Sequence, residues 1–249
     1  MYKQTTIMDQ TAIVIPTYNE KNNVEQLYKE ILELNPNLNI LFVDDNSPDG
    51  TGEILNEFSQ SNPNINVIHR PRKLGIGSAH KTGINWAYRN GYTVLITMDA
   101  DLTHSPKYIL DLLSNASKAE IIIGARNKLK SMKGWDLHRK IATLVAHRII
   151  RIFLGMKYDS TGAFRLYNLK TIPKEVFNLA ASPNYSFFFE SLYVLHANKF
   201  SIAELSIITP ARSSGSSKMK FTDVIDSCLK LTSIFASRLL FKNKYRWIN

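Results

Sequence analysis

The first half of the chain alternates short runs of apolar residues with longer segments in which apolar residues recur every three or four positions. Short apolar runs predict strands, and the longer period predicts amphipathic helices. The predicted strands are Ala12–Ile15, Ile40–Asp44, Asn66–His69, Val94–Asp99 and Glu120–Gly124. The predicted helices are Asn22–Leu34, Gly52–Ser61, Ser78–Asn90 and Pro106–Ser117. This alternation predicts an α/β fold with a mixed, mostly parallel, Rossmann-like sheet flanked by helices.

The pattern changes after Arg126. The predicted elements there are an amphipathic helix at Trp135–Leu154, a strand at Ala163–Tyr167, a helix at Phe187–Lys199, a strand at Ser201–Ile208 and a last helix at Thr222–Phe241. A Ser/Gly-rich loop, Arg212–Ser217, precedes the last helix, and no Pro/Gly-rich linker separates two globular parts. We therefore expect one domain over residues 1–220, followed by a C-terminal amphipathic segment over residues 221–249 that associates with a membrane.

The chain carries 31 Lys and Arg against 21 Asp and Glu, a formal net charge of +10. Such an excess favours a polyanionic partner: nucleic acid, an anionic membrane surface or a phosphorylated substrate. The basic residues are interleaved with apolar ones from Lys128 to Arg151, and basic and aromatic residues alternate from Lys242 to Trp247. This distribution suits a membrane surface better than a nucleic-acid groove. A core-facing helix at 135–154 remains the alternative.

The predicted location is cytoplasmic, at the inner face of a membrane. Met1 to Gln10 contains no apolar run typical of a secretory leader, and the single cysteine, Cys228, cannot form an internal disulfide. No apolar stretch approaches the roughly 20 residues that a membrane-spanning helix requires. We expect a peripheral protein that binds the membrane directly or is recruited by a membrane-anchor subunit.

The segment Asp99-Ala100-Asp101 follows the predicted strand that begins at Val94. Two carboxylates at this spacing can share Mg²⁺ or Mn²⁺ and leave other coordination positions to phosphate oxygens. A cation in this place would neutralise the charge on a departing diphosphate. The alternative for the two aspartates is a solvated turn or a helix cap.

Two other predicted strands also end in polar residues. Asp44 and Asp45 end one strand, and Pro16-Thr17-Tyr18-Asn19-Glu20 ends the first. In open α/β sheets, ligands bind beyond the carboxyl ends of the strands, where an acidic side chain accepts hydrogen bonds from a ribose or a base. The alternative is that Asp45, Asn46 and Asp49 only build the turn and cap the next helix. The Gly75-Ile76-Gly77 segment lacks a third glycine at His80, so we interpret it as a tight entry into a helix.

Five motifs follow one another along the chain: AIVIPTYNE (residues 12–20), VDDNSPDGT (43–51), KLGIGSA (73–79), MDADLTHSP (98–106) and RSSGSSKM (212–219). In this order they resemble family 2 glycosyltransferases of the dolichyl-phosphate or polyprenyl-phosphate mannose synthase group. The resemblance covers roughly residues 11–220. It implies a GT-A fold, GDP-mannose as donor, a polyprenyl (dolichyl or undecaprenyl) monophosphate as acceptor, and inversion at the sugar carbon.

The resemblance also implies roles for residues on the donor side. The nucleotide would be contacted by Pro16, Tyr18, Glu20 and Asp45. The metal and the donor diphosphate would be held by Asp99, Ala100 and Asp101. Thr103 would join Asp99 and Asp101 in the metal shell, as a weaker ligand than the Gln that the family often has there. The family also commonly has Gln at the position of Phe188. These two departures bear on the metal preference and on the sugar site.

On the acceptor side, the resemblance implies that the phosphate is held by Arg126, Arg139, Arg212 and Lys218. The residues predicted to act in catalysis are Asp101, Arg126, Arg212 and Lys218. A phosphate monoester is already anionic at neutral pH and needs no general base to attack. The alternatives are a UDP-sugar donor (glucose or an amino sugar) with a lipid phosphate or polysaccharide acceptor, or a non-catalytic GT-A binding subunit. Nucleic-acid binding ranks last, because the sequence holds no recognition motif.

Overall fold

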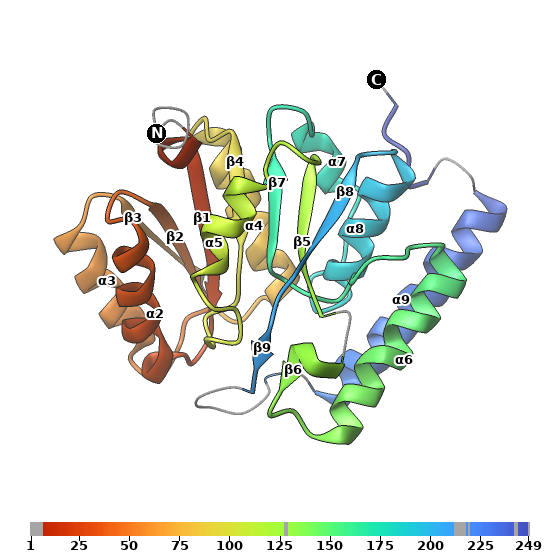
Figure 1. Cartoon of the computed structure of the whole chain (residues 1–249), viewed down its shortest axis with the longest axis horizontal. Coiled ribbons are helices and arrows are strands. Elements are labelled where there is room, and N and C mark those ends of the chain that lie inside the picture. The colour runs from red at the N-terminus through yellow and green to blue at the C-terminus, as the bar shows by residue number, and fades with distance from the viewer. Residues whose placement is uncertain (1–6, 127–128, 212–217, 219, 242–243, 249) are drawn as a thin grey trace.

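The computed structural model describes residues 7–126, 129–211, 218, 220–241 and 244–248. Its main sheet contains β1 (Thr11–Thr17), β2 (Asn39–Asp44), β3 (Ile65–His69), β4 (Val94–Thr97), β5 (Ile121–Ala125), β7 (Arg165–Asn168) and β8 (Ile202–Ser206). The strand order is β3-β2-β1-β4-β7-β5-β8. The helices are α2 (Lys21–Leu34), α3 (Thr51–Ser61), α4 (Ile76–Arg89), α5 (Tyr108–Ser114), α6 (Leu137–Leu154), α7 (Lys174–Asn178), α8 (Phe187–Ala197) and α9 (Phe221–Leu240). They cover both faces of the sheet (Figure 1).

Alternating residues of the strands form two separate cores. On β1, Ala12 and Val14 belong to the core under α4 and α8, whereas Ile13 and Ile15 belong to the core under α2 and α5. Successive side chains of a strand point to opposite faces of its sheet, so a strand buried on both faces is apolar throughout. The uninterrupted apolar runs in the sequence therefore predicted the doubly covered sheet correctly.

Strand β7 runs antiparallel to both of its neighbours, while every other pairing in this sheet is parallel. Leu166 pairs with Ile96 of β4 on one side and with Ile122 of β5 on the other. Because of this reversal, the residues before β7 lie at the edge of the sheet where β4 and β5 end. The segment 159–163 is thereby brought to the same edge as Asp99 and Arg126.

Helices α6 and α9 lie side by side at one end of the molecule (Figure 1). Each buries few of its own side chains: Ile150 and Leu154 on α6, and Ile234 and Ser237 on α9. Their predicted amphipathic character is confirmed, and a row of large apolar side chains faces solvent on both. Among the described residues, no helix is both long enough and apolar enough to span a bilayer.

Most predicted elements are present, with small shifts at their ends. The strand predicted at Val94–Asp99 ends at Thr97, so Asp99 lies in the following loop and not on the strand. No pattern in the sequence predicted α7, the short helical turn Leu129–Ser131, or the two-stranded sheet of β6 (Met132–Lys133) and β9 (Thr209–Pro210). The two strands of this second sheet are two residues long, too short for any period to be visible.

The residues after α9 fold back onto the body of the protein. Tyr245 is buried, and its ring lies 5.5 Å from that of Tyr193 on α8. The side-chain amide of Asn198 donates to the Tyr245 carbonyl at 2.8 Å and accepts from the Trp247 backbone N–H at 2.7 Å. The aromatic residues of this segment therefore pack against the core, and the prediction that they anchor the chain in a membrane is wrong for Tyr245.

Candidate active site

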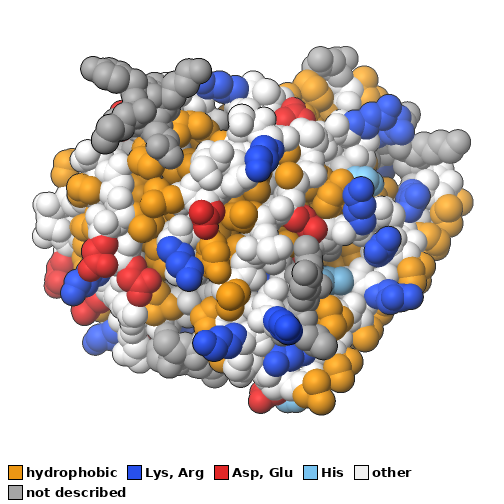
Figure 2. Space-filling model, viewed as in Figure 1, with side chains coloured by type: hydrophobic (Ala, Val, Ile, Leu, Met, Phe, Trp, Pro, Cys, Tyr) orange, Lys and Arg blue, Asp and Glu red, His pale blue; other side chains and the backbone are white. Residues whose placement is uncertain are grey.

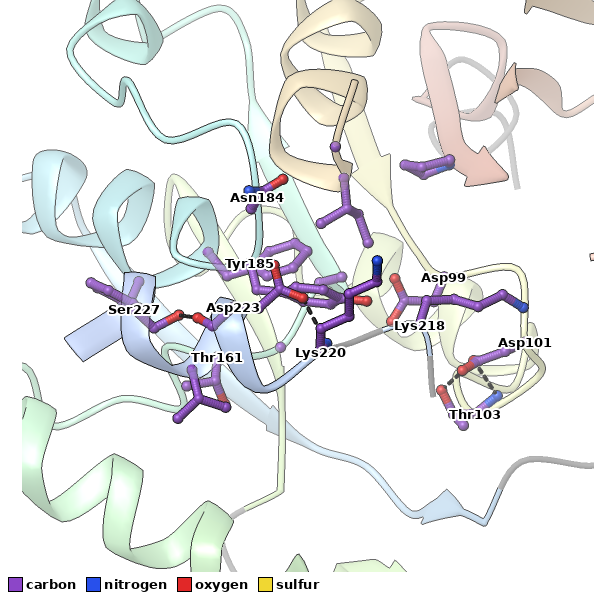
Figure 3. Close-up of a pocket in the computed structure, with 18 of the residues that line it drawn as sticks. Asp99, Asp101, Thr103, Thr161, Asn184, Tyr185, Lys218, Lys220, Asp223 and Ser227 are labelled. Carbon is purple, nitrogen blue, oxygen red and sulfur yellow. Dashed lines mark hydrogen bonds between the residues drawn. The ribbon is translucent and has the colours of Figure 1, made fainter. Parts of the chain in front are cut away.

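A cavity of about 870 Å³ opens at the edge of the sheet where β1 and β4 end. One part is lined by polar residues of the loops after these strands, among them Tyr18, Asp45 and Asp99. The other part continues between α6 and α9, where its walls are mostly apolar. Figure 3 shows the meeting of the two parts, with Asp99 facing the open centre of the pocket. The cavity therefore joins a polar site to an apolar groove.

Asp101 is held rigidly by the turn that contains it. Its Oδ1 accepts the Thr103 hydroxyl at 2.6 Å and the Thr103 backbone N–H at 3.2 Å (Figure 3). Leu102, between them, has a φ of 60°, a left-handed conformation that strains a residue with a side chain. The Asp99 N–H donates to Nδ1 of His104 at 3.2 Å, and the Asp99 side chain is 30% exposed. The loop thus holds Asp101 in place and leaves Asp99 open to the cavity.

The carboxylates of Asp99 and Asp101 suit a divalent cation that is shared with a ligand. Carboxylate oxygens are the ligands that Mg²⁺ and Mn²⁺ prefer. In the described part of the chain, no three His, Cys, Asp or Glu side chains gather in a way that could enclose a metal. A cation bound by the two aspartates would therefore keep positions for phosphate oxygens. Thr103 points its hydroxyl at Asp101, so it supports that carboxylate directly.

Asp45 shapes the loop that precedes α4. It forms an ion pair with Arg70 and accepts the backbone N–H groups of Leu74 at 3.2 Å and Gly75 at 3.3 Å. Burial raises the pKa of Asp45 even though Arg70 acts to lower it. Gly75 has a φ of 96° directly before α4, which confirms its interpretation as a tight helix entry. Asp45 lines the cavity as well, so it orders the loop beside the predicted nucleotide site.

Asp49 builds the turn, as the alternative for Asp45, Asn46 and Asp49 proposed, and Asp44, which that alternative did not include, also builds it. Asp44 accepts hydrogen bonds from the hydroxyls of Thr17 and Ser47, at 3.1 and 2.5 Å. Asp49 accepts the Thr51 hydroxyl at 2.6 Å and the Thr51 N–H at 3.0 Å at the start of α3. In this segment, Asp44 and Asp49 therefore build the turn, whereas Asp45 lines the cavity.

The end of β1 supplies Pro16, Tyr18 and Glu20 to the cavity. The Lys73 ammonium lies 4.1 Å from the centre of the Tyr18 ring. Lys218 reaches the same place: its Nζ donates to the Asn19 carbonyl at 2.9 Å and lies 3.2 Å from Oε1 of Glu20. The structure thus brings Lys218 to the predicted nucleotide contacts as well as to the shared cavity. Arg212 lies outside the described residues.

Arg126 forms a two-pronged ion pair with Asp159, which is fully buried. Its Nε and Nη2 donate to the two carboxylate oxygens at 2.8 and 2.9 Å, and its backbone N–H donates at 2.9 Å. Burial would raise the pKa of Asp159, but Arg126 and His147 hold it well below the usual value. Burial would lower the pKa of Arg126, and Asp159 raises it instead. Both groups are therefore charged at neutral pH.

Arg139 lies over the ring of Trp135, with its guanidinium carbon 3.7 Å from the ring centre. The Trp135 indole N–H donates to the Pro210 carbonyl at 3.1 Å, and Trp135 is buried. The prediction that Trp135 belongs to an interfacial helix is wrong: α6 begins at Leu137, and Trp135 packs into the cavity wall. Because Trp135 contacts Arg139 and β9 together, it places the arginine at the junction of the two parts of the cavity.

Several residues in or beside the cavity gave no separate signal in the sequence. Asp159 and Thr161 precede β7, and they became candidates only when the chain reversal placed them beside Arg126. His147 of α6, which contacts Asp159, and Lys220, which lines the cavity directly before α9, are further examples. Phe188, the second departure from the family pattern, lines the cavity from α8 and is buried. Finding these residues requires the tertiary fold.

Comparison with solved structures supports the architecture. Glucosyl-3-phosphoglycerate synthase from Mycobacterium tuberculosis, solved with Mn²⁺, UDP and phosphoglyceric acid, aligns with a TM-score of 0.63 and 14% identity. The alignment covers 99% of this chain and 84% of that chain. At this identity the likeness establishes the fold alone, and it confirms the predicted GT-A architecture.

Comparison of sequences gives a closer relationship. A polyprenol monophosphomannose synthase from Mycolicibacterium smegmatis is 32% identical over 225 residues, covering 89% of this chain and 85% of the relative. An undecaprenyl-phosphate mannosyltransferase from Micrococcus luteus is 31% identical over 221 residues, covering 88% and 91%. The family model described as "Glycosyl transferase family 2" matches residues 12–176, which hold the aspartate pair, Arg126 and Asp159. The match to the family model and the two relatives together show that this chain is a member of glycosyl transferase family 2.

Proposed function

We propose that the protein transfers mannose from GDP-mannose to a polyprenyl (dolichyl or undecaprenyl) monophosphate, with inversion at the sugar carbon. The observation that carries this proposal is the single cavity, in which the aspartate pair opens into an apolar groove. Arg126 and Arg139 lie on its wall between the two parts. A ligand that is both charged and lipidic fits this combination, and the names of the two sequence relatives agree with it.

The apolar groove suits the first isoprene units of the acceptor. Its α6 wall presents the small or apolar residues Ala142, Ala146 and Ile149, and its α9 wall presents Val224 and Leu231. Burying hydrocarbon against such walls contributes roughly 25 cal/mol per Å² of apolar surface removed from water. A short polar acceptor would leave these walls wet, so the groove favours a lipid over a free sugar phosphate.

The proposed reaction is a direct displacement. An oxygen of the acceptor phosphate attacks the anomeric carbon of mannose, and the bond from that carbon to the β-phosphate oxygen of GDP breaks. The acceptor is anionic at neutral pH, since its second pKa is near 6, and no base has to remove a proton. Arg126 and Arg139 orient the attacking phosphate. Asp99 and Asp101 would hold a Mg²⁺ or Mn²⁺ ion, which would neutralise charge on the leaving diphosphate.

The direct test is an assay of the purified protein with Mg²⁺ or Mn²⁺. GDP-mannose, UDP-glucose and UDP-N-acetylglucosamine would each be offered with undecaprenyl phosphate, dolichyl phosphate or no acceptor. We expect transfer of mannose from GDP-mannose to at least one lipid phosphate, at a rate at least tenfold above either UDP-sugar. Faster transfer from a UDP-sugar would replace the donor assignment and keep the acceptor class. Absence of transfer from every donor would instead support a non-catalytic binding subunit.

The exposed apolar rows of α6 and α9 support peripheral binding to the cytoplasmic leaflet. The exposed apolar residues are Leu137, Ile141, Val145, Ile149 and Ile152 on α6, and Phe221, Val224, Ile225, Leu229, Leu239 and Leu240 on α9. Figure 2 shows hydrophobic and basic side chains interleaved on the flank formed by these helices. Such a mixture is typical of helices that lie in the interface of an anionic membrane. A membrane-anchor subunit could bind to the same exposed apolar surface.

Exchanging Ile152 and Leu229 for glutamate tests whether the exposed faces of α6 and α9 contact the membrane. The two side chains are 69% and 63% exposed, so the exchanges leave the core intact. We expect the double variant to bind vesicles with 30% anionic phospholipid at least tenfold more weakly in a flotation assay, because it loses apolar contact and adds charge that the lipid repels. The matched control is Gln60→Glu, an exposed site on α3. Equal flotation of the double variant and the wild type would show that another surface meets the membrane.

A further inference from the structure

His147 projects from α6 toward the Arg126–Asp159 pair. Its Nε2 lies 2.9 Å from Oδ1 of Asp159 and 3.2 Å from the Thr161 hydroxyl, and the side chain is 16% exposed. Two residues earlier and two residues later on the helix, Val145 and Ile149 belong to the exposed apolar row. One helix therefore carries the proposed membrane surface on one face and a contact to a buried active-site carboxylate on another.

Asp159 accepts hydrogen bonds on both carboxylate oxygens, and each oxygen has a separate task. Oδ2 accepts the backbone N–H and Nε of Arg126, at 2.9 and 2.8 Å. Oδ1 accepts Nη2 of Arg126 at 2.9 Å and the contact from His147 at the same distance. The Thr161 hydroxyl accepts a second hydrogen bond from Nη2, at 2.8 Å. The orientation of the guanidinium thus depends on an oxygen and a hydroxyl that both contact His147.

These bonds leave one nitrogen of Arg126 for a ligand. Among the described residues, no hydrogen bond engages Nη1, and Arg126 lines the cavity. A guanidinium contributes most to phosphate binding when its plane is fixed, because planar donors bind only in matching geometry. Whatever holds Asp159 and Thr161 in place therefore also fixes the direction of Nη1 in a residue that lines the cavity.

We propose that His147 is a positioning residue for the acceptor phosphate, which ties α6 to Asp159 and Thr161 and so fixes the direction of the Arg126 guanidinium. The inference rests on the proposed function, since it assigns the acceptor phosphate to Arg126. It goes beyond that function because it links the position of α6 on the surface to the orientation of Arg126 inside the site. His147 itself need not touch either substrate.

The chemistry of the contact determines which replacements keep it. A carboxylate oxygen accepts hydrogen bonds and donates none when ionised, so Nε2 of His147 must carry the proton in this contact. The amide nitrogen of glutamine lies about as far from the backbone as Nε2 of histidine, whereas that of asparagine lies nearer, at the position of Nδ1. Glutamine at position 147 can therefore donate to Asp159, while asparagine and leucine cannot.

The experiment measures steady-state kinetics of His147→Gln, His147→Asn and His147→Leu with GDP-mannose and undecaprenyl phosphate. We expect the acceptor KM to rise about tenfold in the Asn and Leu variants and the donor KM to stay within twofold, since the donor side does not contact His147. The Gln variant should stay within threefold of the wild type in both constants. The matched control is His138→Leu, an exposed histidine on the same helix.

Thermal unfolding of each variant separates positioning from loss of fold. A Leu variant whose midpoint equals that of the wild type and whose acceptor KM is unchanged would overturn the inference and leave the proposed function intact. A Gln variant as impaired as the Leu variant would also overturn it, because any loss would then come from packing. Absence of lipid mannosylation by the wild type overturns both proposals together.

Discussion

Replacing Asp101 with asparagine is expected to lower turnover about a thousandfold, equivalent to about 4 kcal/mol of lost transition-state stabilisation. The exchange keeps the shape of the side chain and the Thr103 contact site but removes a negative charge from the predicted metal site. A divalent cation is then bound more weakly, and the departing diphosphate is less well neutralised. Turnover would be measured at saturating donor and acceptor over a series of Mn²⁺ concentrations.

The matched control for this change is Asp111→Asn, an exposed aspartate on α5 away from the cavity. Its turnover should equal that of the wild type within twofold. If raising Mn²⁺ restored the Asp101 variant to full turnover, the residue would contribute to metal affinity alone. Unchanged turnover at every Mn²⁺ concentration would show that Asp101 does not hold the metal.

Replacing Asp159 with asparagine should give the largest loss of stability, about 3–5 kcal/mol in the free energy of unfolding. The fully buried Asp159 neutralises Arg126, and removing one partner of a buried ion pair leaves the other charge without compensation. The loss would be measured by urea unfolding at pH 7. Asp136→Asn, an exposed aspartate directly before α6, is the control and should change stability by less than about 0.5 kcal/mol.

The same pair predicts the sign of a pH effect. Because the pKa of Asp159 in the folded protein lies well below its unfolded value, near 3.9, its contribution to stability is complete above that value. The contribution is lost as the pH falls from about 4 toward the folded pKa, because the unfolded state takes up the proton first. The wild type should therefore lose stability between pH 5 and pH 3 more steeply than the Asp159→Asn variant. Parallel curves for the two proteins would contradict this account of the pair.

The elements with a strong local period could be predicted from the sequence. The apolar runs around Ile13, Leu41 and Ile122 are buried on both faces of the sheet, and they correspond to β1, β2 and β5. The location of the residues proposed for the donor also followed from local order, since the aspartates and Pro16 lie at or just after the ends of strands. A residue at the end of a strand is positioned by that strand alone, so its place can be inferred from local pattern.

The contacts of the proposed acceptor wall could not be predicted in this way. Arg126 and Asp159 are 33 positions apart and meet only because β7 inserts in reverse between β4 and β5. The local pattern placed Trp135 in an amphipathic helix, but the short pairing of β6 with β9 draws it inward. Tyr245 is a similar case, because its burial depends on Tyr193, 52 positions earlier. These contacts depend on long-range pairing, which local periodicity does not encode.

The position of β7 in the sheet also has a consequence for folding during synthesis. Both neighbours of β5 in the sheet, β7 and β8, come later in the sequence, so a nascent chain that has just completed α6 holds Ile121–Ala125 without a hydrogen-bonding partner. An apolar strand with open edges invites pairing with other chains. During synthesis, both edges of this strand therefore stay open after α6 ends at Leu154, until β7 has been completed at Asn168.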